Sequence, residues 1–259
     1  MLCGGAPKLF FSEAMTALSN LAAPLISKVA APGYSSLLKA RHELFVKLGI
    51  APRDIGYLNS TMIFASTTNT IPTACWTLYY ILRSPSAHKA VLAELAGKTG
   101  GGGGDREDLP VLSACITETL RVTVSSLVVR RVCDEGYTFK SGLKMRGGDR
   151  VAIFPPLQHH DEGIFPNSSE WNHGRFLEDP SLVSKVIPFG GGISMCPGRH
   201  FALREVKAFV TTALSTLTIT LADPSAPLPP CDPSRVGIGI NQVKPGSDVM
   251  INVEARKKE

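Results

Sequence analysis

The sequence is poor in cysteine and in charge, and both shortages exclude classes of protein. Its six cysteines are scattered over 259 residues with no Cys-x-x-Cys pair, so neither a zinc-binding spacing nor a dense disulfide framework is present. Only 19% of the residues are charged, and the net charge is +5, with the clearest basic cluster at residues 256–258. We therefore expect a chain of a reducing compartment with no nucleic-acid partner.

The sequence also lacks a clear signal or membrane-spanning segment. Residues 1–5 show no cationic start followed by an apolar stretch, so we expect no signal peptide in this chain. Residues 55–82 carry no charged side chain, but Asn, Ser and Thr recur along them and Pro72 interrupts them, which makes lipid exposure costly. This pattern favours a long buried helix over residues 55–83, with a local break at the polar run and the proline.

The apolar content is sufficient for a folded core. Hydrophobic residues make up 44% of the chain, and the 24 glycines and 19 prolines are concentrated in a few short stretches rather than in a repeat. These values suit one large globular domain or two small ones, and they exclude disordered, collagen-like and solenoid chains.

The predicted secondary structure is mainly helical, with short β-strands in the second half. Apolar periodicity predicts the helices, and β-rich pieces between Gly-containing turns predict the strands. The other helices expected are 9–29, 35–48, 85–97, 109–123 and 198–217, and the strands are 127–132, 137–139, 150–154, 236–240 and 249–253. A turn is expected at 31–33, a glycine linker at 100–104 and a loop region over 155–188.

Two of these helices carry more detailed expectations. Asp108 is a candidate N-cap for helix 109–123, with Pro110 in the first turn. The expected apolar face of this helix comprises Leu112, Cys115, Ile116 and Leu120, and that of helix 198–217 comprises Ala202, Val206, Phe209, Ala213 and Leu217.

One cysteine stands between a glycine-rich loop and the start of an amphipathic helix. In residues 189–199, Phe-Gly-Gly-Gly-Ile-Ser-Met-Cys-Pro-Gly-Arg, Cys196 precedes Pro197, which can occupy the first helical turn. The positive helix end would support an anionic sulfur ligand there, and the glycines would let a flat, bulky group approach the backbone. A structural cysteine beside an ordinary glycine turn is the alternative interpretation.

This loop resembles the haem-ligand loop of the cytochrome P-450 family. The string Phe-x-x-Gly-x-x-x-Cys-x-Gly-Arg, followed by Phe-Ala, carries the resemblance, and two further motifs stand in the family's order. Glu118-Thr-Leu-Arg121 matches the family's Glu-x-x-Arg, and Arg175 takes the place of an arginine that completes a buried structural triad. The resemblance covers residues 55–253 and implies the C-terminal half of the cytochrome P-450 fold, mainly α with small β-sheets.

The resemblance also implies a domain organisation. Residues 1–259 would form a single partial domain, because a complete member of the family is about twice this length. Its parts would be the helices preceding the central helix (1–54), the central helix on the haem side (55–83), the Glu-x-x-Arg helix (108–123), and the ligand loop with the following helix (189–217).

Haem b is the cofactor that the resemblance implies, with the thiolate of Cys196 as the metal ligand. The residues that it places at the haem are Phe189, Gly190, Gly192, Cys196, Pro197, Gly198, Arg130 and Ala65. Arg130 matches a position that binds a haem propionate, whereas Ser194 stands where many relatives place a second cation. His159-His160-Asp161 could otherwise suggest a metal site, but the resemblance places it in a structural turn.

One branch of the family is matched in finer detail, the group that contains cholesterol 7α-hydroxylase, sterol 12α-hydroxylase and prostacyclin synthase. Residues 65–72 with Trp76, residues 108–112 and residues 232–239 carry this resemblance. Where most of the superfamily has an acid followed by a threonine, this sequence has Thr68 and Asn69. A monooxygenase must deliver protons to dioxygen before the O–O bond breaks, so a relay through Asn69, Thr70 and ordered water is a hypothesis. The candidate catalytic residues are therefore Asn69, Thr70 and Thr68.

The activity implied by the resemblance is that of a haem-thiolate monooxygenase, which hydroxylates a sterol or another lipid with electrons from a separate reductase. Its thiolate ligand donates electron density to the iron and favours O–O cleavage. One alternative is an isomerase of lipid peroxides, which needs no reductase, and another is a truncated, inactive chain. For the full-length protein the resemblance implies the endoplasmic reticulum membrane, with association through the N-terminal half, since this chain shows no anchor.

Overall fold

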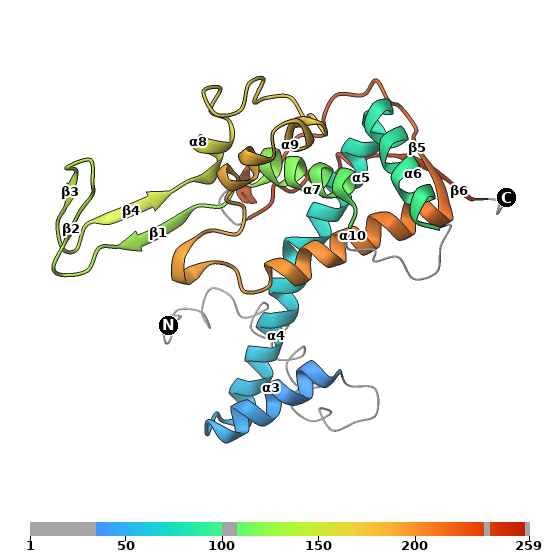
Figure 1. The fold of residues 1–259 in the computed structure, drawn as a ribbon. Coiled ribbons are helices and arrows are strands. Elements are labelled where there is room, and N and C mark those ends of the chain that lie inside the picture. Colours follow the sequence, from blue (N-terminus) through green and yellow to red (C-terminus); the bar gives the residue numbers. More distant parts are fainter. Residues whose placement is uncertain (1–34, 100–107, 236–238, 257–259) are drawn as a thin grey trace. The chain divides into compact units, whose positions relative to one another are not determined.

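The structure, a computed structural model, describes residues 35–99, 108–235 and 239–256 (Figure 1). It is mainly helical with small antiparallel sheets, which confirms the predicted fold class. The chain divides into two compact units, Met1–Thr68 and Asn69–Glu259, and each is described by itself. The predicted helix 9–29, turn 31–33 and glycine linker 100–104 lie outside the described residues.

The described part of the first unit contains α3 (Ser36–Lys47) and α4 (Pro52–Thr68). Ser35 is the N-cap of α3, and its Oγ accepts a hydrogen bond from the backbone N–H of Leu38 at 3.3 Å. The predicted helix 35–48 is therefore confirmed. In the described ranges, no helix is both long enough and apolar enough to cross a membrane.

The predicted central helix is interrupted at Asn69, where α4 ends and α5 (Thr70–Arg83) begins. The hydroxyl of Thr68 donates to the carbonyl of Phe64 at 2.7 Å, and such side-chain bonds compete with helical hydrogen bonding. Pro72 lies in the first turn of α5, where its missing N–H leaves no helical hydrogen bond unmade. The local break that the polar run and the proline predicted is confirmed, and it separates two helices.

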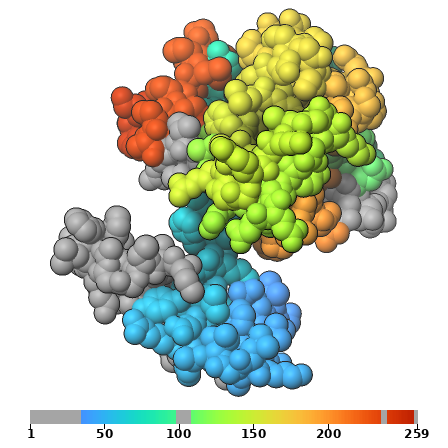
Figure 2. All heavy atoms as spheres, turned by 90° about the vertical axis from the view of Figure 1, so that its left-hand side faces the viewer, coloured from blue at the N-terminus to red at the C-terminus, as the bar shows by residue number. Residues whose placement is uncertain are grey.

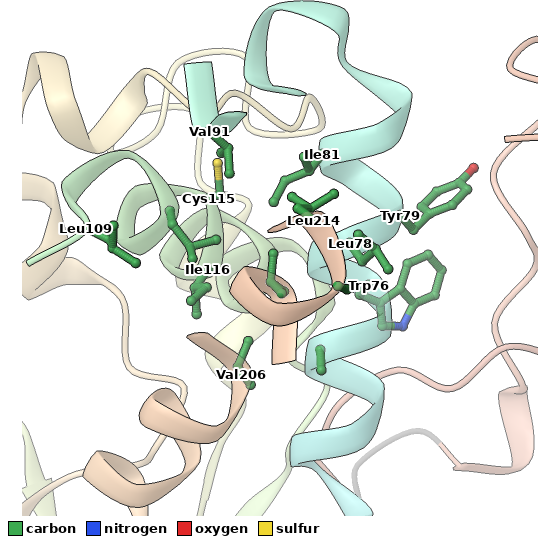
Figure 3. Close-up of a cluster of buried hydrophobic side chains, with 14 of the residues drawn as sticks. Trp76, Leu78, Tyr79, Ile81, Val91, Leu109, Cys115, Ile116, Val206 and Leu214 are labelled. Carbon is green, nitrogen blue, oxygen red and sulfur yellow. The ribbon is translucent and has the colours of Figure 1, made fainter. Parts of the chain in front are cut away.

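Four helices form the core of the second unit: α5, α6 (Pro85–Thr99), α7 (Pro110–Thr123) and α10 (Arg199–Thr216). Their buried apolar side chains meet in one hydrophobic cluster (Figure 3). Its labelled members are Trp76, Leu78, Tyr79, Ile81, Val91, Leu109, Cys115, Ile116, Val206 and Leu214. All four residues of the predicted apolar face of helix 109–123 are buried, so that prediction is confirmed.

Helix α10 buries part of the predicted stripe: Val206 and Ala213 are buried as predicted, whereas Phe209 is not. Val206, Val210 and Leu214 follow one another at intervals of four residues and are almost fully buried. Phe209, which was assigned to the apolar side, is 46% exposed. The prediction was wrong at Phe209 because the contacts of α10 with α5 and α7 select the buried stripe, and periodicity alone allows a neighbouring one.

The N-terminus of α7 is capped from another helix and not by Asp108. Its N-cap residue is Leu109, which makes no side-chain capping bond. The carboxylate of Glu94 on α6 accepts hydrogen bonds from the backbone N–H groups of Val111 at 2.7 Å and Leu112 at 2.9 Å. An acidic group in this place satisfies two unpaired donors and complements the helix dipole. The Asp108 prediction was wrong because the partner comes from a different helix.

Two short antiparallel sheets follow α7 and face the viewer in green to yellow in Figure 2. In the first, β1 (Val128–Arg131) pairs with β4 (Arg150–Ile153), and in the second, β2 (Tyr137–Thr138) pairs with β3 (Lys144–Met145). Strands β1, β2 and β4 lie within the predicted segments 127–132, 137–139 and 150–154, and β3 was not predicted.

A further sheet lies near the end of the chain, where β5 (Leu217–Leu221) pairs antiparallel with β6 (Ile251–Ala255). The sequence predicted a strand at 249–253, and it predicted the end of the preceding helix to within one residue, but it assigned no strand to residues 218–221, so β5 was missed. Of the predicted strand 236–240, residues 236–238 lie outside the described residues, and Ile240 forms a single bridge with Val124.

The predicted loop 155–188 contains short helices, so the prediction of an irregular loop was wrong there. They are α8 (Pro155–His159), α9 (Arg175–Glu178) and the 3-10 helix η1 (Pro180–Lys185). Prolines start α8 and η1, where a missing N–H costs no hydrogen bond. Asp179 caps η1 by accepting from the backbone N–H of Ser181 at 3.0 Å.

Candidate active site

Cys196 lies in a loop whose first residue is anchored to the hydrophobic cluster. Its backbone N–H donates to the carbonyl of Phe189 at 2.9 Å, and the Phe189 side chain packs against that cluster. Within the loop, Gly190 and Gly192 have φ values of +71° and +60°, which other residues rarely adopt. The glycines therefore let the chain turn back between Phe189 and Cys196, around the 3-10 turn η2 (Gly192–Ser194).

A turn after Cys196 places the cysteine before helix α10. The backbone N–H of Arg199 donates to the Cys196 carbonyl at 3.4 Å, and Gly198 has the φ of −84° and ψ of 1° that suit the third residue of a type I turn. Pro197 is the second residue of this turn, where its fixed φ is favourable. Since α10 begins at Arg199, the prediction that Pro197 occupies the first helical turn was wrong.

Arg199 belongs to this site, although the predicted site residues did not include it. Its guanidinium Nη1 donates to the Cys196 carbonyl at 3.1 Å, beside the bond from its own backbone N–H. A charged donor on this carbonyl restrains the peptide group of Cys196. The Cys-x-Gly-Arg spacing could have predicted this contact, because an arginine three residues after the cysteine can reach back across the turn.

The loop fits a haem bound through a thiolate. Cys196 is a free, half-buried thiol. No atom lies within 4 Å of the point where a side chain would start on Gly191 or Gly192, so a flat group has room at the backbone there. Cysteine thiolate is an established axial ligand of haem iron. The donor and the open glycine backbone are both present.

Glu118, Arg121 and Arg175 form a buried ion cluster that links α7 to α9. Nε and Nη2 of Arg121 donate to the two carboxylate oxygens of Glu118, each at 2.8 Å. Nε of Arg175 donates to Oε1 of the same carboxylate at 3.1 Å. Glu118 and Arg121 are fully buried and Arg175 is 7% exposed. The single negative charge of Glu118 thus balances one of the two positive charges of Arg121 and Arg175.

The remaining donors of these arginines bind backbone carbonyls between α8 and α9. Nη1 of Arg121 donates to the carbonyls of His159 at 2.6 Å and Ser168 at 2.7 Å. Nη1 of Arg175 donates to the carbonyl of Pro166 at 2.7 Å. The cluster therefore holds the connection between α8 and α9 against α7 and satisfies polar groups that burial would otherwise leave unpaired.

His159 is a buried neighbour of this cluster with both ring nitrogens in use. Its Nε2 accepts from the backbone N–H of Ile187 at 3.0 Å, so its Nδ1 carries the proton and donates to the Arg121 carbonyl at 3.2 Å. Burial lowers the pKa of His159 to about 4. No nitrogen lone pair is left for a metal, which agrees with the structural role expected for His159-His160-Asp161.

We predict a pH-dependent contribution of His159 to stability. Below about pH 6.5 His159 binds a proton in the unfolded chain, whereas in the folded chain it binds one only near pH 4. The free energy of unfolding therefore falls as the pH is lowered from about 6.5 to about 4. Urea unfolding of the wild type and of His159→Gln over this pH range tests it. The stability difference between them should narrow below pH 6.5, and a difference that stays constant contradicts the prediction.

Arg130 and Ser194 make no contact that shows a role at a haem. Arg130 lies exposed in β1, and within the described residues its side chain makes one hydrogen bond, from Nη1 to the carbonyl of Val129 at 3.1 Å. Ser194 lies exposed at the end of η2. The propionate-binding role of Arg130 stays a prediction.

The residues predicted for proton delivery differ in their hydrogen bonding. Thr68 lies on α4 in the first unit, and its hydroxyl is bonded to its own helix. Ala65, which was predicted to lie at the haem, is also on α4, and its role there stays a prediction. Asn69 and Thr70 open the second unit, and Oδ1 of Asn69 accepts from the backbone N–H of Ile240 at 3.2 Å. No hydrogen bond of the Thr70 hydroxyl is present in the described part of the chain.

Comparison with known proteins gives one family and a group of sterol hydroxylases. The family described as Cytochrome P450 matches residues 34–246. The 5-beta-cholestane-3-alpha,7-alpha-diol 12-alpha-hydroxylase of Sus scrofa is 34% identical over 88% of this chain and 50% of its own length. The 7-alpha-hydroxycholest-4-en-3-one 12-alpha-hydroxylase of Homo sapiens is 37% identical over 74% of this chain and 43% of its own length.

A third relative, a cholesterol 7-alpha-monooxygenase, has a sequence identity to this chain close to that of the first two. The cholesterol 7-alpha-monooxygenase of Cricetulus griseus is 32% identical over 69% of this chain and 41% of its own length. The matched part of the chain thus spans half or less of the length of these three relatives.

Proposed function

Since the chain belongs to the cytochrome P450 family, we propose that the protein is a haem-thiolate monooxygenase that hydroxylates a sterol. Proteins of this family in general hold their haem iron by a thiolate, and we assign that ligand to Cys196. The observation that carries the proposal is the loop itself, a half-buried free thiol next to open glycine backbone, with its peptide held by Phe189 and Arg199.

The chain's own residues position the ligand, and the haem, when bound, supplies the oxygen-activating chemistry. The Phe189 carbonyl and the Arg199 guanidinium hold the two sides of the Cys196 backbone, which restricts the positions of its sulfur. The cluster of Glu118, Arg121 and Arg175 acts further away, because it holds the segment that precedes this loop against α7.

We assign proton delivery to the Thr70 hydroxyl with ordered water. This hydroxyl is at the first helical position of α5 and is not used in a hydrogen bond among the described residues. A hydroxyl can accept one proton and pass on another, whereas a neutral amide such as that of Asn69 is a poor proton carrier. The Thr68 hydroxyl is already donated to the Phe64 carbonyl, which leaves Thr70 as the better candidate.

The substrate and partners follow from the relatives and the resemblance. The relatives are named for oxidation at carbon 12 or carbon 7 of a sterol. We therefore propose a sterol as the substrate class of this protein. A separate reductase would supply electrons, and the full-length protein would act at the endoplasmic reticulum membrane.

A second candidate is an isomerase of lipid peroxides, and the hydrogen bonding of Thr68 and Asn69 favours it. Neither residue has a carboxylic acid, and each is engaged with a backbone group. Rearrangement of a peroxide needs no external electrons and no proton delivery to dioxygen, so it tolerates this arrangement better than hydroxylation does.

One experiment separates the two candidates. The haem-loaded protein is incubated with 7-alpha-hydroxycholest-4-en-3-one, cholesterol or 25-hydroxycholesterol, together with reductase and reduced nicotinamide cofactor, and separately with a lipid peroxide alone. We expect a hydroxylated sterol that forms only with the reductase present. Rearranged product from the peroxide without reductase would establish the isomerase instead, and absence of both products would overturn both candidates.

A further inference from the structure

Arg199 carries a positive charge at a place that its helix does not favour. It is the first residue of α10, and the first turn of this helix contains no acidic residue. The free N–H groups at a helix N-terminus give that end a partial positive charge, so a cation there is destabilising. The preferences of α10 therefore do not explain an arginine at this position, and the explanation must come from what its side chain contacts.

The side chain of Arg199 folds back over the turn to the ligand residue. In the part of the chain that the structure describes, its guanidinium makes one hydrogen bond, from Nη1 to the Cys196 carbonyl at 3.1 Å, and forms no ion pair. Arg121 and Arg175, in contrast, share the carboxylate of Glu118. Arg199 is half-buried, so water screens its charge only in part. The charge of Arg199 thus acts on the Cys196 peptide without a carboxylate that would cancel it.

The sulfur of Cys196 lies close to the same turn. A side chain on Gly198 would start 3.9 Å from Cys196 Sγ, so the sulfur is beside the backbone that leads into Arg199. The Cys196 carbonyl also accepts from the backbone N–H of Arg199 at 3.4 Å, and it therefore keeps a partner if the guanidinium is removed. What the side chain adds is a positive charge next to the ligand residue.

We propose that Arg199 is a positioning residue that holds a positive charge on the ligand residue and thereby raises the reduction potential of iron bound by Cys196. The inference rests on the proposed function, because it takes Cys196 as the iron ligand. Reduction adds one electron, which the reductase supplies, and a nearby positive charge stabilises the reduced state. Hydrogen bonding around a ligand is one of the ways in which proteins set such potentials. Arg199 thus favours transfer of the first electron from the reductase.

Redox titration of the haem-loaded protein tests the effect of the charge. At a fixed electrode potential, the ratio of ferrous to ferric haem should be about tenfold lower in Arg199→Leu than in the wild type, which corresponds to a midpoint potential about 59 mV lower. Arg199→Gln keeps an N–H donor without the charge and should fall nearly as far, whereas Arg199→Lys keeps the charge and should stay closer to the wild type. A ratio in Arg199→Leu within a factor of about two of the wild-type ratio overturns the proposal.

Arg204 provides a matched control on the same helix. It lies further along α10 and is exposed. Arg204→Leu removes the same charge from a place where water screens it, so the ratio of ferrous to ferric haem should change by less than about twofold. Equal falls in Arg204→Leu and Arg199→Leu would show that the net charge of α10, and not the contact with Cys196, sets the potential, and would overturn the proposal.

Urea unfolding of the same proteins separates this role from a structural one. Removal of the charge at the positive end of α10 should leave the urea midpoint of Arg199→Leu unchanged or slightly higher. If the arginine only braces the loop, Arg199→Leu and Arg199→Gln should both unfold at lower urea concentration and lose haem. That result would overturn the proposal.

The carbon monoxide difference spectrum separates failure of this inference from failure of the proposed function. If the reduced, haem-loaded wild type shows no thiolate-type band, Cys196 is not the iron ligand, and the proposed function and the inference fall together. If the wild type and Arg199→Leu both show this band and have the same reduction potential, the assignment of the ligand stands and the inference alone is wrong.

Discussion

Replacement of Glu118 by Gln is expected to lower the free energy of unfolding by about 3–5 kcal/mol, the cost of breaking a buried ion pair. The carboxylate is fully buried and accepts from both Arg121 and Arg175. The amide keeps the shape but leaves two buried positive charges without a counterion. In glutamine an NH2 group also replaces one of the two carboxylate oxygens, so its N–H groups would face the N–H groups of an arginine. Urea unfolding at neutral pH measures the loss.

The exposed pair Asp134–Arg131 provides a matched control for this prediction. It has the same spacing of three residues, but its side chains are 96% and 73% exposed and the charged atoms are 3.8 Å apart. Asp134→Asn should therefore change stability by less than about 1 kcal/mol. Equal losses in Glu118→Gln and Asp134→Asn would show that burial of the Glu118 cluster does not control the stability of this unit.

Replacement of Cys196 by Ser is expected to abolish sterol hydroxylation while leaving the fold intact. The contacts that hold this residue are made by its backbone N–H and carbonyl, so the loop loses none of them on substitution. The serine hydroxyl is nearly isosteric with the thiol, but it does not provide a thiolate to iron. Activity should fall below detection, and the free energy of unfolding should change by less than about 1 kcal/mol.

Cys133 offers a matched control for Cys196. It is a free and exposed cysteine in the same unit, outside the ligand loop. Cys133→Ser should keep wild-type activity, measured as hydroxysterol formed per haem in the reductase assay. Activity of Cys196→Ser within a factor of about two of the wild type would contradict the assignment of the ligand.

Local signals in the sequence were sufficient for much of the fold and of the ligand loop. The apolar face of α7 was predictable because its residues recur at helical spacing and are buried by any partner on that side. The pairing of Glu118 with Arg121 was predictable because residues three apart share a helix face. Arg175 could be added only through the resemblance to a family, since it lies 54 positions after Arg121.

Features that depend on distant partners were missed or assigned wrongly. The cap of α7 comes from Glu94, and the partner of Asn69 is Ile240, and no short motif connects either pair. Strand β5 follows α10 without an intervening glycine or proline, so only its pairing with the distant strand β6 distinguishes it as a strand. In each case tertiary contacts decide between local conformations that the sequence permits equally.

The carbon monoxide difference spectrum of the reduced, haem-loaded protein tests the central claim most directly, because its band position reports the axial ligand of the iron. Our account predicts a thiolate-type band in the wild type and in Cys133→Ser, and the loss of that band in Cys196→Ser. A thiolate-type band that persists in Cys196→Ser, or its absence from the wild type, would contradict the account.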